Sequence, residues 1–215
     1  MTRQKQRHTQ RGEAQKQKLV DAAYDIIAEE GFEGLRTREV AGRANLNIST
    51  LHYYFATKED LVRNVARRLL SEFKEGREAQ EGQPAGGKPG KPGPLEMLRV
   101  SFSDQNRIIR KRPATYVVVM ELFTRSLHDR KMGPVVQELL DTWEGHFRSL
   151  VTEGVQAGQI SPQSDVPTTV RALQSLLIGR AMMTLIMGEE AEPERMFQQV
   201  SRWLAARGKN GSSDS

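Results

Sequence analysis

Hydrophobic side chains recur at helical spacing along most of the chain. Over residues 15–30 the apolar positions fall three, four, seven and eight residues apart, which is the period of a helix with one buried face. This pattern predicts a helix that ends at Gly31, a suitable C-cap. Phe32 and Leu35 are expected to fill the space between this helix and the next pair.

Residues 37–58 predict two short helices joined by a tight turn. Thr37 is a suitable N-cap for the first helix, because its hydroxyl can satisfy a free backbone N–H. Asn45 stands where the chain must turn, and asparagine tolerates the left-handed conformation better than most other non-glycine residues. Asn47 is expected to cap the second helix, which covers about residues 48–55.

The second of these helices leaves a hydrogen-bonding face toward solvent. The side chains that it does not need for packing are one aliphatic group and several hydroxyl, imidazole and phenol groups, with no acid among them: Ile48, Ser49, Thr50, His52, Tyr53 and Tyr54. A helix-turn-helix lays its second helix in the major groove of DNA, which is lined by phosphates. The segment is therefore predicted to bind DNA.

The sequence GFEGLRTREVAGRANLNISTLHYYFATKEDL resembles the DNA-binding signature of TetR-type transcriptional repressors. The matching positions cover the end of the first helix, both helices of the motif and the start of a fourth helix: Gly31, Phe32, Thr37, Ala41, Ala44, Thr50, Leu51, Tyr53, Phe55, Lys58, Glu59 and Leu61. The resemblance covers about the first 70 residues. Two positions depart from the family pattern, since Asn45 replaces the usual turn glycine and His52 replaces the usual tyrosine.

Chemistry and resemblance together assign nine residues to DNA binding. Thr37 and Arg38 open the first helix of the motif, where a helix N-terminus and a cation both favour a phosphate oxygen. Ser49 and Thr50 lie where a recognition helix meets base edges, and Ile48 could contact a thymine methyl. The resemblance implies phosphate contacts, with packing inside the domain as the alternative for either tyrosine, at Tyr53, Tyr54 and Lys58. It leaves the role of His52 open, and Arg43 is expected to be solvated.

A fourth helix and an abrupt change of composition follow the motif. Thr57 and Asp60 form a capping-box pattern for a helix that ends near residue 77. Residues 78–94 contain four prolines, five glycines and no large apolar side chain, so they predict a flexible linker. A phosphate-binding loop is excluded, because Pro92 stands where that motif needs serine or threonine.

Beyond the linker the chain is predicted to be helical almost to its end. Proline and glycine separate helices expected over residues 95–112, 114–128, 133–155, 167–188 and 193–204. No strand pattern appears, so the predicted fold class is all-α. It comprises an N-terminal three-helix helix-turn-helix domain and a larger C-terminal helical domain for ligand binding and dimerisation.

The last two helices carry more apolar surface than one core face requires. Surplus apolar surface in a soluble chain is usually buried against a second copy. The resemblance also implies a homodimer built on these helices, and a cavity whose small-molecule effector, of unknown identity, releases DNA. Large, soft side chains on inward faces could line such a cavity or be ordinary core: Phe102, Met120, Phe123, Trp143, Phe147 and Met183.

Composition narrows the class of protein. The net charge of +5 and the pI near 9.6 favour an anionic partner, and the absence of cysteine excludes disulfides and thiolate sites. Residues 1–14 are basic and lack apolar side chains after Met1, so they predict a disordered arm that either contacts DNA or is solvated. No apolar run approaches the roughly 18 residues of a membrane span, and a cytoplasmic location is expected.

These observations predict a sequence-specific DNA-binding transcriptional regulator, a ligand-released repressor that binds an inverted-repeat operator as a dimer. The alternative is a helical interaction protein whose reader domain has lost specific DNA binding. No enzyme activity, cofactor or metal site is expected, because the four histidines lack metal-ligand spacing and no nucleophile motif is present. The predicted segments are the arm at 1–14, the helix-turn-helix at 15–60, a connecting helix at 61–77, the linker at 78–94, the effector-binding domain at 95–207 and a disordered tail at 208–215.

Overall fold

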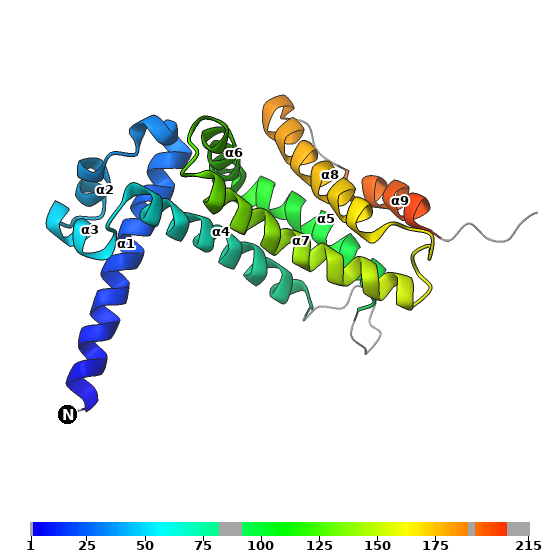
Figure 1. Cartoon of the computed structure of the whole chain (residues 1–215), viewed down its shortest axis with the longest axis horizontal. Coiled ribbons are helices and arrows are strands. Elements are labelled where there is room, and N and C mark those ends of the chain that lie inside the picture. The colour runs from blue at the N-terminus through cyan, green and yellow to red at the C-terminus, as the bar shows by residue number, and fades with distance from the viewer. Residues whose placement is uncertain (1, 82–91, 189–191, 206–215) are drawn as a thin grey trace, which may run out of the picture. The chain divides into compact units, whose positions relative to one another are not determined.

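The computed structural model describes the backbone of residues 2–81, 92–188 and 192–205, and within these ranges all side chains except those of 2–9 and 75–81. Every regular element in these ranges is an α-helix (Figure 1), which confirms the predicted all-α class. The helices are α1 (Thr2–Gly34), α2 (Thr37–Arg43), α3 (Ile48–Tyr54), α4 (Lys58–Glu81), α5 (Pro94–Lys111), α6 (Pro113–His128), α7 (Gly133–Gln156), α8 (Val166–Met187) and α9 (Pro193–Leu204).

The first helix is longer than its hydrophobic pattern. Its backbone is helical from Thr2 onward, which departs from the disordered arm predicted over residues 1–14. Glutamine, lysine and arginine are good helix formers, and adding a turn to a helix already anchored by packing needs no new nucleus. Gly31 interrupts the helix with φ 69° and ψ −171°, which confirms the predicted break.

The predicted linker is only partly described. The backbone of α4 stays helical through Glu81, so the first residues of the predicted 78–94 linker belong to this helix. Residues 82–91 lie outside the described part of the chain, and so does the predicted tail at 208–215.

The chain forms two compact units whose bounds differ from the predicted segments. The first unit contains Met1–Glu72 together with Pro113–Leu139, and the second contains Phe73–Arg112 together with Leu140–Ser215. The sequence predicts that α6 belongs to the C-terminal domain, whereas the structure packs α6 against α1 in the first unit.

Three hydrogen bonds, one buried and two partly buried, hold α6 in the first unit. The Tyr24 hydroxyl of α1 donates to Thr115 Oγ1 of α6 at 3.1 Å, and Thr115 Oγ1 donates to Glu72 Oε2 of α4 at 3.1 Å. The backbone N–H of Phe32 donates to Glu121 Oε2 of α6 at 3.2 Å. Polar groups shielded from water are costly to leave without a partner, so these hydrogen bonds help to fix the position of α6 on the helices around it.

The second unit has its own apolar core. Buried side chains from α5, α7, α8 and α9 form it, including Leu98, Phe102, Phe147, Val151, Val170, Leu173, Phe197 and Val200. Arg180 of α8 is only 6% exposed, and its guanidinium donates to Gln105 Oε1 at 2.7 Å and to the Phe102 carbonyl at 2.9 Å. Among the described helices, α8 has the length and apolar composition to cross a membrane, properties that a core helix of a soluble protein shares.

Candidate nucleic-acid interface

The turn between α2 and α3 has the local chemistry that its sequence predicts. Asn45 adopts φ 52°, and the Leu46 N–H donates to the Ala41 carbonyl at 2.9 Å. Asn47 caps α3, because its side chain accepts a hydrogen bond from the Thr50 backbone N–H. Both asparagine predictions are confirmed, so the turn sets the direction in which α3 leaves α2.

The predicted N-cap of α2 is wrong. Arg36 occupies the cap position with an extended backbone and no side-chain cap bond, and Thr37 is the first helical residue. The Arg36 carbonyl accepts the first helical hydrogen bond, from the Val40 N–H at 2.9 Å, so the helix begins at Thr37, one residue earlier than the prediction requires. Thr37 is exposed.

Two buried side chains anchor the recognition helix. Leu51 and Phe55 lie on the inner side of α3 and are 2% and 1% exposed. Helical spacing then turns the remaining positions outward. Of the nine predicted DNA-binding residues, Thr50 and Tyr54 are half-buried and the other seven are exposed: Thr37, Arg38, Ile48, Ser49, His52, Tyr53 and Lys58.

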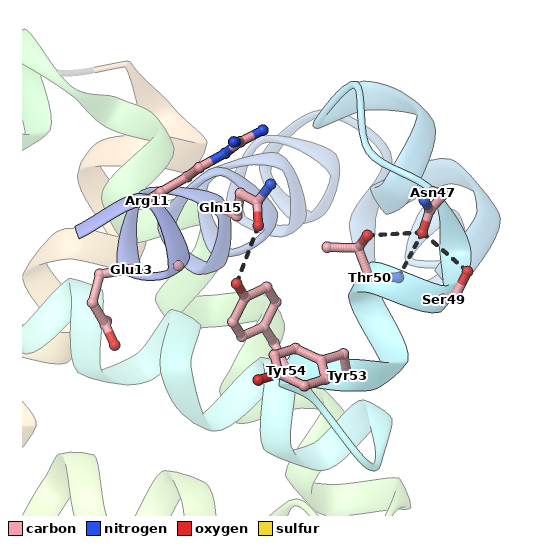
Figure 2. A pocket seen from close by; sticks show the side chains of 9 residues that line it. Arg11, Glu13, Gln15, Asn47, Ser49, Thr50, Tyr53 and Tyr54 are labelled. Atoms are coloured by element: carbon pink, nitrogen blue, oxygen red, sulfur yellow. Dashed lines mark hydrogen bonds between the residues drawn. The ribbon is translucent and has the colours of Figure 1, made fainter. Parts of the chain in front are cut away.

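The two tyrosines have different environments. Tyr53 is 82% exposed, whereas the Tyr54 hydroxyl donates to Gln15 Oε1 of α1 at 3.2 Å (Figure 2). A Cβ atom at Gly12 would lie 3.3 Å from the Tyr54 hydroxyl, so the glycine permits this close approach. Of the two alternatives, Tyr54 therefore packs on α1 and Tyr53 remains available to a partner.

A groove of about 760 Å³ lies between α1 and α3. Its walls carry guanidinium, amide, hydroxyl and phenol groups and one carboxylate, from Arg11, Glu13, Gln15, Asn47, Ser49, Thr50, Tyr53 and Tyr54, together with Gly12 (Figure 2). The helical extension of α1 thus brings Arg11 to the same groove as the first turn of the recognition helix. Donor-rich walls of this kind can hold a sugar-phosphate strand.

Two cations near the motif have different environments. Lys58 is exposed as a whole residue, but its Nζ lies 5.6 Å from the centre of the Phe32 ring. The partial loss of water around this ammonium group, assisted by the positive charge of Arg125, lowers the pKa of Lys58. Arg43 donates to Glu29 at 2.6 Å and to Glu30 at 3.0 Å, and the hydrogen bond to Glu29 raises the pKa of Arg43. Arg43 is exposed, as predicted, and its ion pairs with these two glutamates also join α2 to α1.

The six residues predicted for an effector cavity do not lie in one unit. Met120 and Phe123 are on α6 in the first unit, while the other four are in the second. The Phe102 ring lies 5.8 Å from Phe197, and the Trp143 ring lies 5.1 Å from Phe73. Phe147 is buried in the apolar core, but Met183 is 51% exposed in the single chain, so its predicted inward position is wrong.

Among the described side chains, no group of three or more acidic, histidine or cysteine residues could hold a metal ion.

Comparison with known proteins finds matches to most of the chain. A family model for bacterial regulatory proteins of the tetR family matches residues 19–72, and one for the C-terminal part of BetI-type transcriptional repressors matches residues 96–209. The chain is 25% identical over 149 residues to the fatty acid metabolism regulator protein of Bacillus subtilis (strain 168), which covers 69% of this chain and 72% of that protein.

Solved structures share the fold at low sequence identity. FadR from Bacillus subtilis in complex with stearoyl-CoA has a TM-score of 0.72 at 19% identity and covers 88% of this chain and 97% of its own. A transcriptional regulator from Saccharomonospora viridis in complex with choline has a TM-score of 0.68 at 18% identity, covering 87% and 94%. At these identities the similarity establishes the fold alone.

Proposed function

The chain belongs to the TetR family of bacterial regulatory proteins, and we propose that it represses transcription by binding an inverted-repeat DNA operator as a homodimer until a small-molecule effector releases it. The outward face of α3 carries this proposal. It presents hydroxyl, imidazole and phenol groups without an acidic side chain, on a helix whose position is fixed by the buried Leu51 and Phe55. The function needs binding only and is proposed to take place in the cytoplasm, without catalysis or a cofactor.

An exposed apolar surface supports the homodimer. Large side chains of α8 and α9 face solvent in the single chain: Met182, Met183, Ile186, Met187 and Trp203. Surfaces of this kind are buried when a symmetric partner packs on them. Two copies would place two recognition helices for half-sites about one helical turn, 34–36 Å, apart on DNA.

Selection from random double-stranded oligonucleotides at near-physiological salt tests the proposed function. We expect the purified protein to enrich an inverted repeat and to prefer it over random DNA by about 10³ or more. Weak binding without enrichment, which disappears as salt is raised, would instead favour a helical interaction protein that has lost specific DNA binding.

Replacing Lys58 with alanine is expected to weaken binding to all DNA sequences about equally. The ammonium group is proposed to contact a phosphate, so its loss removes one counterion-release contact and lowers the slope of log K against log salt by about one. Titrations of operator and random DNA at several salt concentrations measure this slope. Lys111→Ala, on the exposed end of α5 in the second unit, is the control and should leave the slope unchanged. A loss of affinity confined to the operator would contradict the phosphate role.

Stearoyl-CoA is expected to release the protein from its operator, whereas choline is not. A relative that aligns with 69% of this chain is a fatty acid metabolism regulator, and a structure with the same fold holds stearoyl-CoA. The core of the second unit is built from large apolar side chains, the kind of group that an acyl chain would contact. Release requires the ligand to bind the DNA-free form more tightly than the DNA-bound form. Fluorescence anisotropy of a labelled operator complex measures release, with coenzyme A lacking the acyl chain as control. Release by choline alone would show that the effector is a different class of molecule.

A further inference from the structure

We propose that Asn47 makes Thr50, and less strictly Ser49, a hydrogen-bond acceptor, so that the recognition helix contacts exocyclic amino groups of bases rather than their carbonyl oxygens. The inference rests on the proposed function, because it concerns how α3 reads an operator. The donors that it assigns on DNA are adenine N6 and cytosine N4, the amino groups of the major groove.

The orientation of the Asn47 side chain is fixed by the backbone. The Thr50 backbone N–H lies 2.7 Å from Asn47 Oδ1. A backbone N–H can only donate, so the atom that faces it must be the amide oxygen and not the amide nitrogen. The same contact caps α3, so the oxygen keeps this position for as long as the helix is formed.

The two hydroxyls beside this oxygen must donate to it. Thr50 Oγ1 lies 2.8 Å and Ser49 Oγ 3.1 Å from Asn47 Oδ1 (Figure 2). A hydroxyl has one proton and an amide oxygen has none, so each hydroxyl gives its proton to Asn47 and keeps only lone pairs for another partner. The oxygen has two lone pairs for three donors, and the longest of the three contacts is the one from Ser49. Thr50 is therefore held more firmly as an acceptor than Ser49.

A hydroxyl whose proton is already donated to Asn47 distinguishes between amino groups and carbonyl oxygens in the major groove. It can accept from an amino group without any rearrangement. To meet guanine O6 or thymine O4 it would have to take its proton back from Asn47, and one hydrogen bond would be lost. A loss of this size corresponds to about three- to tenfold in affinity.

The selected sequence alone cannot test this preference, because every base pair presents both an amino group and a carbonyl oxygen in the major groove. Selection with the wild type and with the isosteric Thr50→Val variant first locates the base pair that depends on the hydroxyl. Analogues at that pair then change one group at a time. Purine for adenine, or 2-pyrimidinone for cytosine, deletes the amino group and keeps the ring nitrogen that pairs with the opposite base. The control replaces the oxygen opposite with sulfur, a weak acceptor, through 4-thiothymine for thymine or 6-thioguanine for guanine, and keeps the imino N–H that the pair needs.

Deleting the amino group is expected to weaken wild-type binding about three- to tenfold more than replacing the oxygen with sulfur, while Thr50→Val shows no such difference between the two analogues. Asn47→Ala should abolish the difference, because it frees the hydroxyl protons. Asn47→Asp retains the accepting oxygen and the cap, so it should keep the difference even if total affinity falls. Circular dichroism establishes that each variant is folded.

A larger penalty for replacing the oxygen with sulfur, or identical selected sequences for wild type and Thr50→Val, would overturn the inference and leave the proposed function intact. Failure of the wild type to enrich any sequence would overturn the proposed function, and the inference with it.

Discussion

Replacing Phe55 with alanine is expected to lower the free energy of unfolding of the first unit by about 3–5 kcal/mol and to abolish operator binding. Phe55 is 1% exposed, and its removal leaves a cavity that the surrounding helices fill only partly. The ring also lies at the C-cap of α3 and, with Leu51, is one of the two buried side chains that hold this helix. Its removal therefore affects both the stability of the first unit and the placement of the recognition helix.

Tyr53 provides the matched control for this substitution. Tyr53→Ala removes a comparable ring from the same helix, but the side chain is 82% exposed, so we expect a change in stability within about 0.5 kcal/mol. Urea unfolding followed by circular dichroism, with hydrogen exchange of the α3 amides, measures both variants. Phe55→Ala with wild-type exchange in α3 would show that the ring does not anchor the helix.

Replacing Gly31 with alanine is expected to destabilise the first unit by about 1–3 kcal/mol. The backbone there has φ 69° and ψ −171°, a conformation that is essentially restricted to glycine. A Cβ atom would also lie 3.3 Å from Glu121 Oε2, the oxygen that accepts the Phe32 N–H. The substitution is thus expected to strain α1 and to disturb its contact with α6.

A second glycine-to-alanine change in the same unit separates strain from the general effect of adding a methyl group. Gly42 lies within α2, and nothing lies within 4 Å of a Cβ atom placed there. Gly42→Ala should leave stability unchanged or raise it by up to about 1 kcal/mol, because alanine is the better helix former. Thermal unfolding measures the stability of both variants, Gly31→Ala and Gly42→Ala. Hydrogen exchange of amides in the first unit shows whether the change in stability lies there. Equal effects would mean that the Gly31 conformation is not a source of strain.

Features of the motif set by neighbouring residues could be predicted from the sequence. The left-handed Asn45, the Asn47 cap and the reciprocal Thr57–Asp60 capping bonds each depend on atoms within a few residues. The positions of the helices could be predicted from hydrophobic spacing, which is also a local property. The observed end of α4, at Glu81, lies a few residues beyond the predicted end near residue 77. The outward face of α3 could be predicted because Leu51 and Phe55 fix the opposite face.

Contacts between distant segments could not be predicted. Tyr54 pairs with Gln15, and Arg43 pairs with Glu29 and Glu30, but no spacing rule links residues on different helices. The allocation of α6 to the first unit depends on partners such as Tyr24 and Thr115, which are separated by most of the first half of the chain. The helical form of residues 2–14 was missed because a pattern without apolar side chains says nothing about whether an adjacent helix continues through it.

The attachment of α6 to α1 and α4 in the first unit limits how this protein can be recombined with its relatives. A chimaera joined between α4 and α5 would transplant the recognition helix but leave behind α6, the segment that bonds to Tyr24, Phe32 and Glu72. The grafted reader would then meet a foreign α6 with unmatched polar groups. Exchanging DNA specificity between such regulators therefore requires two grafts, one of Met1–Glu72 and one of Pro113–Leu139.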